Sequence, residues 1–429
     1  MAWKLKLDRL VGGLWRLAII LLPWQTRYFF EGPTVNGWPW EQGRLSLYTS
    51  WLVMASVVAV TYHATRNTQH KSIKAYFGLI LLLVSSLFTL SPRATLEFWI
   101  EAALLASFVA ALVRLRVTRE QLATWFVISL IPHLALGFWQ WTSQMVTGSK
   151  WLGMSAQNPL TSGVSVIEVA GQRILRVYGG FPHPNIFGGW LALAIPLAVW
   201  LISRGRSVFL SSVFCLLSSS ILVLTFARGA WIACALGLVA VLFFWYRENH
   251  SEFPRKLGKV DRRMWVILGL MLLSVGITAF QTRDMMFIRL QSTARLEVKS
   301  LDERSQGLAN GWRLFVEHPV FGVGPGAAIY GLSAETPYES TPPIPPHLVP
   351  LLILDEVGIV GIIGLTLVGY WLFKKRSSPI MVMPLTVIVT LSLFDHYPWS
   401  LWSGRALAIL AITFCILSSE ILKPAELAG

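Results

Sequence analysis

Runs of apolar residues recur along the whole chain, separated by short polar or charged segments. A run of about 20 apolar residues is long enough to cross the hydrocarbon core of a bilayer as an α-helix. The pattern therefore predicts an all-α polytopic integral membrane protein with about twelve transmembrane helices. The expected spans are residues 14–30, 45–62, 73–90, 94–113, 121–142, 186–202, 208–226, 229–246, 264–281, 348–373, 379–394 and 404–422.

Polar segments divide these spans into two parts. Residues 1–145 are expected to form five helices with short connections, and residues 146–429 to form the other seven as the functional core. The core begins with a polar loop at 146–185 and contains a longer one at 282–346. Within the longer loop we expect short surface helices, because residues 303–317 have the periodicity of an amphipathic helix lying on a membrane.

The composition agrees with a membrane protein. The 429 residues are 54% hydrophobic and 14% charged, with a mean hydropathy of +0.58, which excludes an ordinary soluble globular protein. The three cysteines fall inside expected spans, and the eight histidines show no metal-ligand spacing. The sequence therefore predicts no disulfide, no metal site and no cofactor.

The net charge of +14 would suggest a nucleic-acid partner in a soluble protein, but its distribution indicates another role. Most of the 36 Lys and Arg residues fall in alternate short connections, including the basic segment 247–263. Basic residues concentrate in the cytoplasmic loops of membrane proteins. We therefore expect both termini and segment 247–263 in the cytoplasm, the loops 146–185 and 282–346 outside, and no nucleic-acid partner.

The first outer loop ends in a cluster of polar residues at the mouth of a span. Gly and Pro residues at 179–184 impose a tight backbone there. Asn185 is placed either to cap the helix expected to begin at Ile186 or to contact a substrate, and both alternatives stay open. The candidate binding residues in this loop are Arg173, Arg176, His183 and Asn185.

Two arginines of the expected outer segments are awkwardly placed for charged side chains. Arg228 lies at the tip of a hairpin between two spans that offers nothing else polar, so an anion is favoured over snorkelling to lipid phosphate. Arg304 shares a helical stripe with Leu308, Trp312 and Phe315, which presses it toward protein or lipid. Arg313 lies on the opposite side of that helix and is expected to be a solvated charge.

The end of the longer loop carries further candidates. A glycine-rich turn at 322–326 is a weak phosphate-binding pattern, and a stiff proline-rich segment at 341–346 delivers His347 to the start of a span. A helix N-terminus disfavours the protonated imidazole, so a neutral His347 would accept a proton; a capping or water-facing histidine is the alternative. The candidates in this region are Gly324, His347, Asp355 and Glu356.

Together these residues resemble the O-antigen ligase and O-antigen polymerase family, which joins lipid-linked glycans outside the bacterial inner membrane. The blocks that carry the resemblance are Gly180-Phe-Pro-His-Pro-Asn185, Phe226-Ala-Arg-Gly-Ala-Trp231, Glu303-Arg304 through to Gly326, and His347 through to Gly361. One departure is Leu348, where the family usually has Asn. The family's Glu matches Glu356, whereas helical phase puts Asp355 nearer the His347 face, so the choice of carboxylate stays open.

The resemblance implies a metal-independent, all-helical glycosyltransferase of the GT-C-like type in the inner membrane, with its active site facing outside. Its donor would be a glycan on undecaprenyl diphosphate, and its acceptor a glycan, lipid or protein. Family roles make Arg228 and Arg304 the pyrophosphate-binding residues and His347 the base. Ligase and polymerase differ only in the acceptor, which the sequence does not distinguish.

Two other classes of function stay open. A transporter of a small anion or solute would also be polytopic, but such proteins tend to have inverted repeats, which this sequence does not show. A non-catalytic partner in envelope assembly would have no need of His347.

Overall fold

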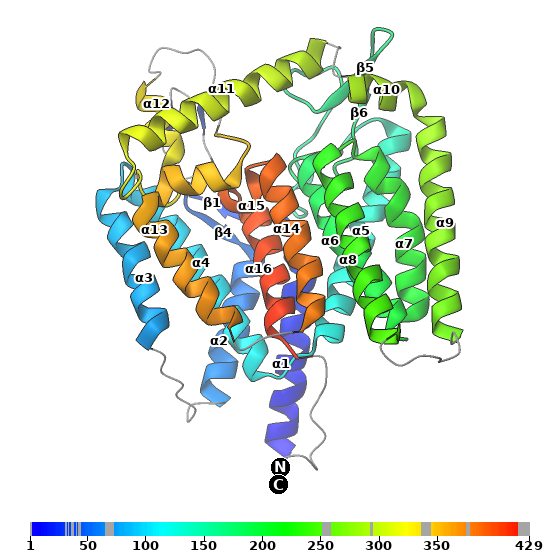
Figure 1. Ribbon diagram of the computed structural model, residues 1–429, viewed down its shortest axis with the longest axis horizontal. Coiled ribbons are helices and arrows are strands. Elements are labelled where there is room, and N and C mark those ends of the chain that lie inside the picture. The colour runs from blue at the N-terminus through cyan, green and yellow to red at the C-terminus, as the bar shows by residue number, and fades with distance from the viewer. Residues whose placement is uncertain are drawn as a thin grey trace.

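The computed structural model is a bundle of helices with hairpins and shorter helices over one end (Figure 1). It describes residues 2–418 except 31, 33, 36–37, 40, 42–43, 65–72, 251–258, 292–294, 336–344 and 375–377. Parts of the basic segment 247–263, the proline-rich segment 341–346 and the last expected span therefore lie outside the described residues. The end that carries the hairpins is opposite to the start of α1 (Ala2–Leu21) and is called the loop end below (Figure 1).

Each expected span coincides with a helix along the bundle. After α1 these are α2 (Thr49–Ala64), α3 (Ile73–Ser85), α4 (Pro92–Arg114), α5 (Arg119–Ser143), α6 (Pro184–Ser203), α7 (Val208–Leu224), α8 (Arg228–His250), α9 (Lys259–Gln281), α13 (Val349–Phe373), α14 (Val382–Phe394) and α16 (Trp402–Ile416). Among the described residues, six are long and apolar enough to cross a membrane, namely α4, α5, α6, α8, α9 and α13. Helices α3, α7, α14 and α16 are apolar but shorter, so a count of about twelve crossings is not confirmed.

The first expected span, 14–30, is wrong at its end. Helix α1 ends at Leu21, and β1 (Arg27–Phe29) pairs antiparallel with β4 (Ser46–Tyr48). The reason is Pro23, which has no backbone N–H to continue the helix and disfavours helical geometry in the residue before it. Two more hairpins, β2 (Thr34–Val35) with β3 (Trp38–Pro39) and β5 (Val166–Val169) with β6 (Gln172–Leu175), mean that the loop end is not all-α.

Helix α6 forms the centre of the bundle. Every residue from Ile186 to Ile202 is buried, and the helix packs against α5, α7, α8, α14 and α16. A helix that is apolar on all sides buries its whole circumference. A Cβ at Gly188 would lie 3.0 Å from the Cβ atoms of Ala227 and Ala230, so a glycine there lets the starts of α6 and α8 approach each other.

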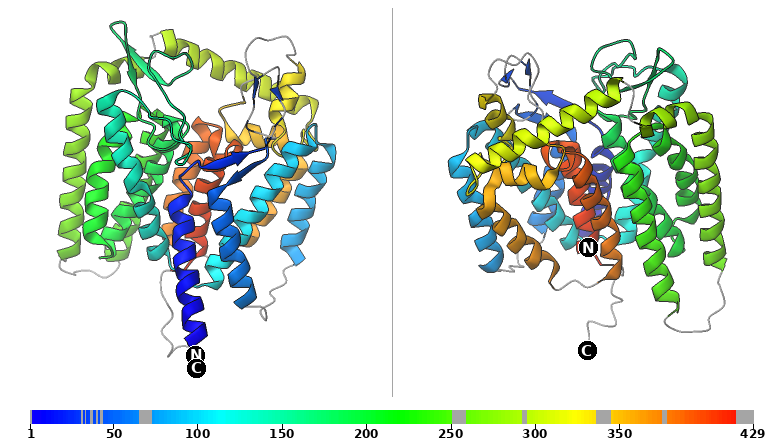
Figure 2. Two further views of the ribbon diagram at one scale, coloured as in Figure 1. Left: turned by 180° about the vertical axis from the view of Figure 1, so that it is seen from behind. Right: turned by 45° about the horizontal axis from the view of Figure 1, so that its top comes forward.

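A second group of helices packs beside this centre. Helices α3 and α13 cross where a Cβ at Gly78 would lie 2.9 Å from the carbonyl oxygen of Gly364, a close approach typical of membrane helices. The views in Figure 2 show α3 and α13 on one flank and α7 and α9 on the other. Helix α14 and the short helix α15 (Tyr397–Ser400) lie between these flanks.

The segment 282–346 contains surface helices, as predicted. Helix α10 (Arg283–Gln291) leads into α11 (Arg295–Glu317), which crosses the loop end over the start of α13, and α12 (Ala328–Glu335) follows (Figure 2, right). The buried face of α11 consists of Glu297, Gly307, Gly311 and Leu314.

The predicted stripe on α11 is wrong in part. Leu308 and Trp312 are 40% and 59% exposed, so they do not face the protein. Arg304 precedes the buried Gly307 by three residues and therefore lies along the buried face, partly buried, while Arg313 is exposed as expected. The contrast between the two arginines is confirmed, although the partners expected for Arg304 are not.

Candidate functional site

A cavity of about 340 Å³ opens at the loop end between the starts of α6 and α8, the end of α14 and helix α11. Three arginines line it, Arg228, Arg289 and Arg304, together with Asn185 and Asp395. The rest of its wall is largely apolar and includes Ile232, Leu301, Leu391 and Phe394. The cavity therefore combines a cationic pole with an apolar side.

Arg228 enters this cavity because of the tight turn between α7 and α8. Phe226, in the middle of that turn, is buried and has a left-handed backbone with φ of +50°, so the chain reverses within three residues. The Arg228 guanidinium donates from Nη1 to the carbonyl oxygen of Arg289 at 2.9 Å, and its Nη2 lies 3.6 Å from Oε2 of Glu297. Its position at the first residue of α8 adds the positive end of a helix dipole to its own charge.

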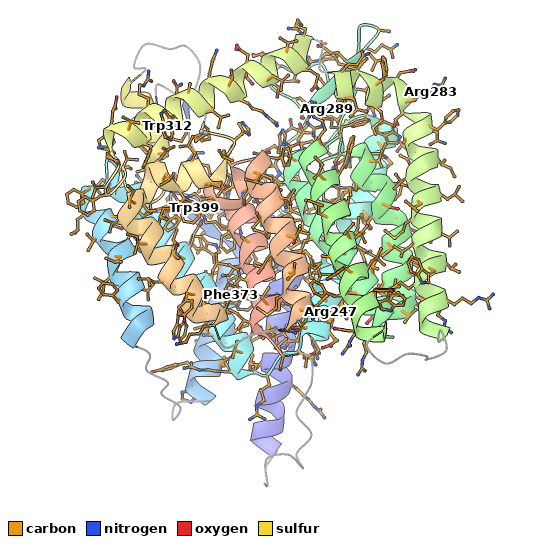
Figure 3. All side chains as sticks on the ribbon, viewed as in Figure 1. Arg247, Arg283, Arg289, Trp312, Phe373 and Trp399 are labelled. Atoms are coloured by element: carbon orange, nitrogen blue, oxygen red, sulfur yellow. The ribbon has the colours of Figure 1, made fainter. Side chains whose placement is uncertain are left out.

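Arg289 on α10 is the arginine that the sequence did not single out. It is 7% exposed, forms an ion pair with Glu297 and donates from Nε to the carbonyl oxygen of Phe226 at 3.1 Å. Glu297 at the start of α11 thus holds both Arg228 and Arg289, and fixes α10 and α11 against the α7–α8 turn. Figure 3 shows that Arg289 and Trp312 both lie at the loop end, whereas Arg247 lies at the opposite end of the bundle.

Arg304 differs from the other two arginines of the cavity. Within the part of the chain that the structure describes, it has no hydrogen-bond or ion-pair partner, although it is partly buried and lines the cavity. A partly buried guanidinium needs an acceptor, and phosphate or carboxylate oxygens match its fork of N–H donors best.

On the other side of the cavity a hydrogen-bonded chain runs from Arg176 to His347. Arg176 is 4% exposed and donates from Nη2 to Oδ1 of Asn185 at 2.7 Å. Asn185 in turn donates from Nδ2 to Oδ2 of Asp395 at 2.8 Å. The other carboxylate oxygen, Oδ1, accepts from the backbone N–H of His396 at 2.8 Å and lies 3.2 Å from Nδ1 of His347.

This chain determines which ring nitrogen of His347 is available. Burial alone would raise the pKa of Asp395, but the hydrogen bonds from His347 and Asn185 hold that pKa well below its usual range. An ionised carboxylate only accepts hydrogen bonds, so Nδ1 of His347 must carry the proton. In the neutral ring Nε2 is then the free acceptor.

Asn185 does not cap α6, so that alternative is wrong. The helix begins at Pro184, and Nδ1 of His183 accepts from the backbone N–H of Asn185 at 3.1 Å. Burial lowers the pKa of His183 to about 3, with a further contribution from Arg176, so His183 is a neutral cap. Burial and the nearby charge of Arg289 lower the pKa of Arg176 to about 9, which leaves it protonated at neutral pH.

Four predicted residues lie elsewhere. Arg173 belongs to the β5–β6 hairpin, where its Nε lies 3.9 Å from Oε1 of Glu168, its cross-strand partner. Gly324, with φ of +99°, packs on Thr89 and donates its backbone N–H to the carbonyl oxygen of Glu356 at 2.8 Å. The Glu356 carboxylate accepts from the Gly326 N–H at 2.8 Å and from Nε1 of Trp399 at 2.7 Å.

Asp355, the remaining candidate of α13, is fully buried beneath α11. A Cβ at Gly311 would lie 3.1 Å from Oδ2 of Asp355 and 3.0 Å from Cγ of Pro346, so α11 rests directly on the start of α13. Together with Glu356 and the glycine-rich turn, Asp355 belongs to the packing that supports His347, outside the lining of the cavity.

The structure also brings together three residues of metal-ligand type. Atoms of His347, Asp395 and His396 lie within 4.8 Å of one another, a group that the sequence spacing did not predict. The nearby Arg176, Arg228, Arg289 and Arg304 make the surroundings strongly cationic, which opposes a divalent ion and favours an anion. Burial lowers the pKa of His396 to about 4, so at neutral pH this histidine adds no charge.

Two residues of the site were missed in the sequence, Arg289 and Asp395. Asp395 ends an apolar span beside His396, and an ionisable residue at such a position could have been singled out as a functional candidate. Arg289 lies among several other charged residues of 283–297, and nothing in the sequence distinguishes it from them.

Residues 213–366 match the family model described as O-antigen ligase, a segment that includes Arg228, Arg289, Arg304 and His347. No curated protein gives a significant match to the chain. Together with the six long apolar helices of the described chain, this match indicates a multi-pass membrane protein. Over residues 213–366 the chain is therefore similar to the O-antigen ligase family, the family that its sequence resembles.

Proposed function

We propose that the protein is an inverting glycosyltransferase that moves a glycan from undecaprenyl diphosphate to an acceptor hydroxyl outside the inner membrane. The family match supports a ligase- or polymerase-type enzyme in general. The observation that carries the finer proposal is the cavity in which three arginines meet Asp395, the residue bonded to His347.

The donor diphosphate would bind at the cationic pole of the cavity. Arg304 offers a guanidinium with no protein partner among the described residues, and Arg228 adds a second one held by Glu297. Charge accumulates on the diphosphate as its bond to the sugar breaks, so fixed cations at this position stabilise the transition state more than the ground state. The apolar wall formed by Ile232, Leu391 and Phe394 suits the first isoprene units of the lipid.

His347 would act as the base. Its Nε2 takes the proton from the acceptor hydroxyl as the oxygen forms a bond to the anomeric carbon. At the same time the bond between that carbon and the phosphate oxygen breaks, and undecaprenyl diphosphate leaves with the electron pair. Attack and departure occur on opposite faces of the sugar, so the anomeric configuration inverts.

Asp395 would orient His347 and stabilise the imidazolium that forms. Asn185 donates to Asp395 from the other side at 2.8 Å and itself accepts a hydrogen bond from Arg176 at 2.7 Å. The proposed chemistry therefore needs only side chains of this chain, with no metal ion in the reaction.

The test is transfer by the purified protein in nanodiscs, with a lipid-linked donor, an acceptor and EDTA. Wild type should form product with inverted configuration, and His347→Ala should lose about two to four powers of ten in turnover while retaining donor binding. His347→Gln should be no better, because an amide cannot act as a base. Product at the wild-type rate from His347→Ala would overturn the base assignment, and solute flux in liposomes without any transfer would favour a transporter.

A further inference from the structure

A second cavity, of about 750 Å³, lies at the loop end beside the β1–β4 hairpin. One wall is the start of that hairpin, a second is the loop 146–157, and the third is the segment from Tyr178 to Pro182. The last of these walls continues within three residues into Asn185, which lines the arginine cavity. The two cavities therefore lie on one continuous segment that contains the cap of α6.

The walls of the second cavity are fixed to each other. Thr26 donates from Oγ1 to the carbonyl oxygen of Trp151 at 2.7 Å. Gly153, with φ of +64°, rests on the backbone of Gln25 so closely that a Cβ would collide with the Gln25 carbonyl group. Arg27 is held by Glu41 at 2.6 Å and by the hydroxyl of Tyr48. These contacts form a built cavity whose shape does not depend on a ligand.

Its lining combines aromatic rings with polar groups, and Arg27 and Lys150 add two charged side chains. Tyr28 and Phe29 are 67% and 47% exposed, and Gln157 and Ser155 face the same space. A pyranose ring has C–H faces that pack on aromatic side chains, and hydroxyls that pair with amides, each of which donates and accepts. An acyl chain would leave these polar groups unpaired, so the lining matches a saccharide better than a lipid tail.

We propose that this cavity binds the saccharide of the acceptor, an inference that rests on the proposed transferase function. Its inner wall leads to the base: the ring of Tyr178 lies 6.4 Å from that of His183, which caps α6 beside Asn185, and Asn185 holds the Asp395 partner of His347. The donor diphosphate is assigned to the arginine cavity. A glycan that reaches His347 from the other side is therefore the acceptor.

The experiment compares variants that fill or strip this cavity with matched variants outside it. Ser155→Trp fills the cavity and Tyr28→Ala removes an aromatic face, whereas Ser162→Trp and Tyr370→Ala change exposed residues that do not line it. Steady-state transfer is measured in nanodiscs while either the lipid-linked donor or the acceptor, rough lipopolysaccharide, is varied. Where wild type uses a second lipid-linked glycan as acceptor, that molecule takes the place of rough lipopolysaccharide.

We expect KM for the acceptor to rise about tenfold in the two cavity variants, with KM for the donor unchanged, and both matched variants to behave as wild type. A rise in KM for the donor alone would mean that the cavity holds donor glycan and would overturn the proposal. Unchanged KM values for both donor and acceptor would overturn it too. Binding of the saccharide released from rough lipopolysaccharide is measured in parallel with His347→Ala protein. If Ser155→Trp abolishes saccharide binding, the cavity assignment is supported even if no transfer is observed. If wild type transfers glycan but no saccharide binds in this cavity, the cavity assignment is refuted and the transferase function stands.

Discussion

Nδ1 of His347 lies 3.2 Å from Oδ1 of Asp395, although the two residues are 48 positions apart in the sequence. The pairing joins the start of α13 to the end of α14, where Asp395 is also bonded to Asn185 of α6. Three helices thus converge on one carboxylate, which fixes the ring of His347 and its tautomer.

The first prediction concerns Asp395. Asp395→Asn keeps the shape of the side chain but can present an N–H to Nδ1 of His347, which favours the wrong tautomer. Turnover should fall by about two to four powers of ten with little change in KM for the donor. The control is Asp284→Asn, at an exposed residue of α10, which should be silent. Equal turnover in Asp395→Asn and wild type would remove Asp395 from the mechanism.

The second prediction uses the contrast between two arginines of α11. Arg304→Ala should abolish measurable transfer, because Arg304 lines the cavity and has no described protein partner, whereas Arg313→Ala should be nearly silent at its exposed position. Arg304→Lys should recover activity only in part, since an ammonium retains the charge without the bidentate fork. Equal losses at both positions, measured as kcat/KM for the donor, would contradict the assignment.

The fold could be predicted from the sequence to the extent that apolar length alone determines it. Each expected span contains a helix among its described residues, because an apolar run of that length satisfies its backbone in lipid by forming one. The short hairpins were missed because strands of two to four residues leave no periodic pattern. On α11 the sequence left open whether the stripe with Leu308 and Trp312 faces protein or lipid, and their exposure shows that it does not face the protein.

The site was predictable where a residue conflicts with its surroundings. Arg228 was found because a charge beside an apolar span needs a partner, and Arg304 because helical phase puts it on the apolar side of a surface helix. Asp395 carries the same signal and was overlooked, but its pairing with His347 depends on α13 and α14 meeting at one end, which the sequence does not specify. The glycine-rich turn had a packing explanation: Gly324 and Gly326 bond to Glu356, which a local pattern cannot distinguish from phosphate binding.

The third prediction tests the orientation that the distribution of Lys and Arg implies. Ser162 is exposed at the loop end, and Glu248 lies at the other end of the bundle, paired with Arg204 at 3.8 Å. The native cysteines are buried, so single cysteines at these two positions report on sidedness without replacing them. In intact spheroplasts an impermeant thiol reagent should label Ser162→Cys and not Glu248→Cys. The reverse pattern would put the arginine cavity in the cytoplasm and exclude an extracytoplasmic reaction.

The last prediction concerns Glu297, whose carboxylate binds Arg228 at 3.6 Å and forms an ion pair with Arg289. Its side chain is 6% exposed, so Glu297→Gln leaves two neighbouring cations without a counter-charge in a buried place. Breaking a buried pair of this kind typically costs about 3–5 kcal/mol, so the thermal midpoint should fall. Bound diphosphate would replace the missing negative charge. Undecaprenyl diphosphate should therefore raise the thermal midpoint of Glu297→Gln more than that of wild type, while Glu317→Gln, at an exposed residue of the same helix, should respond as wild type does. Equal stabilisation of Glu297→Gln and wild type by the ligand would mean that the diphosphate does not bind beside these arginines.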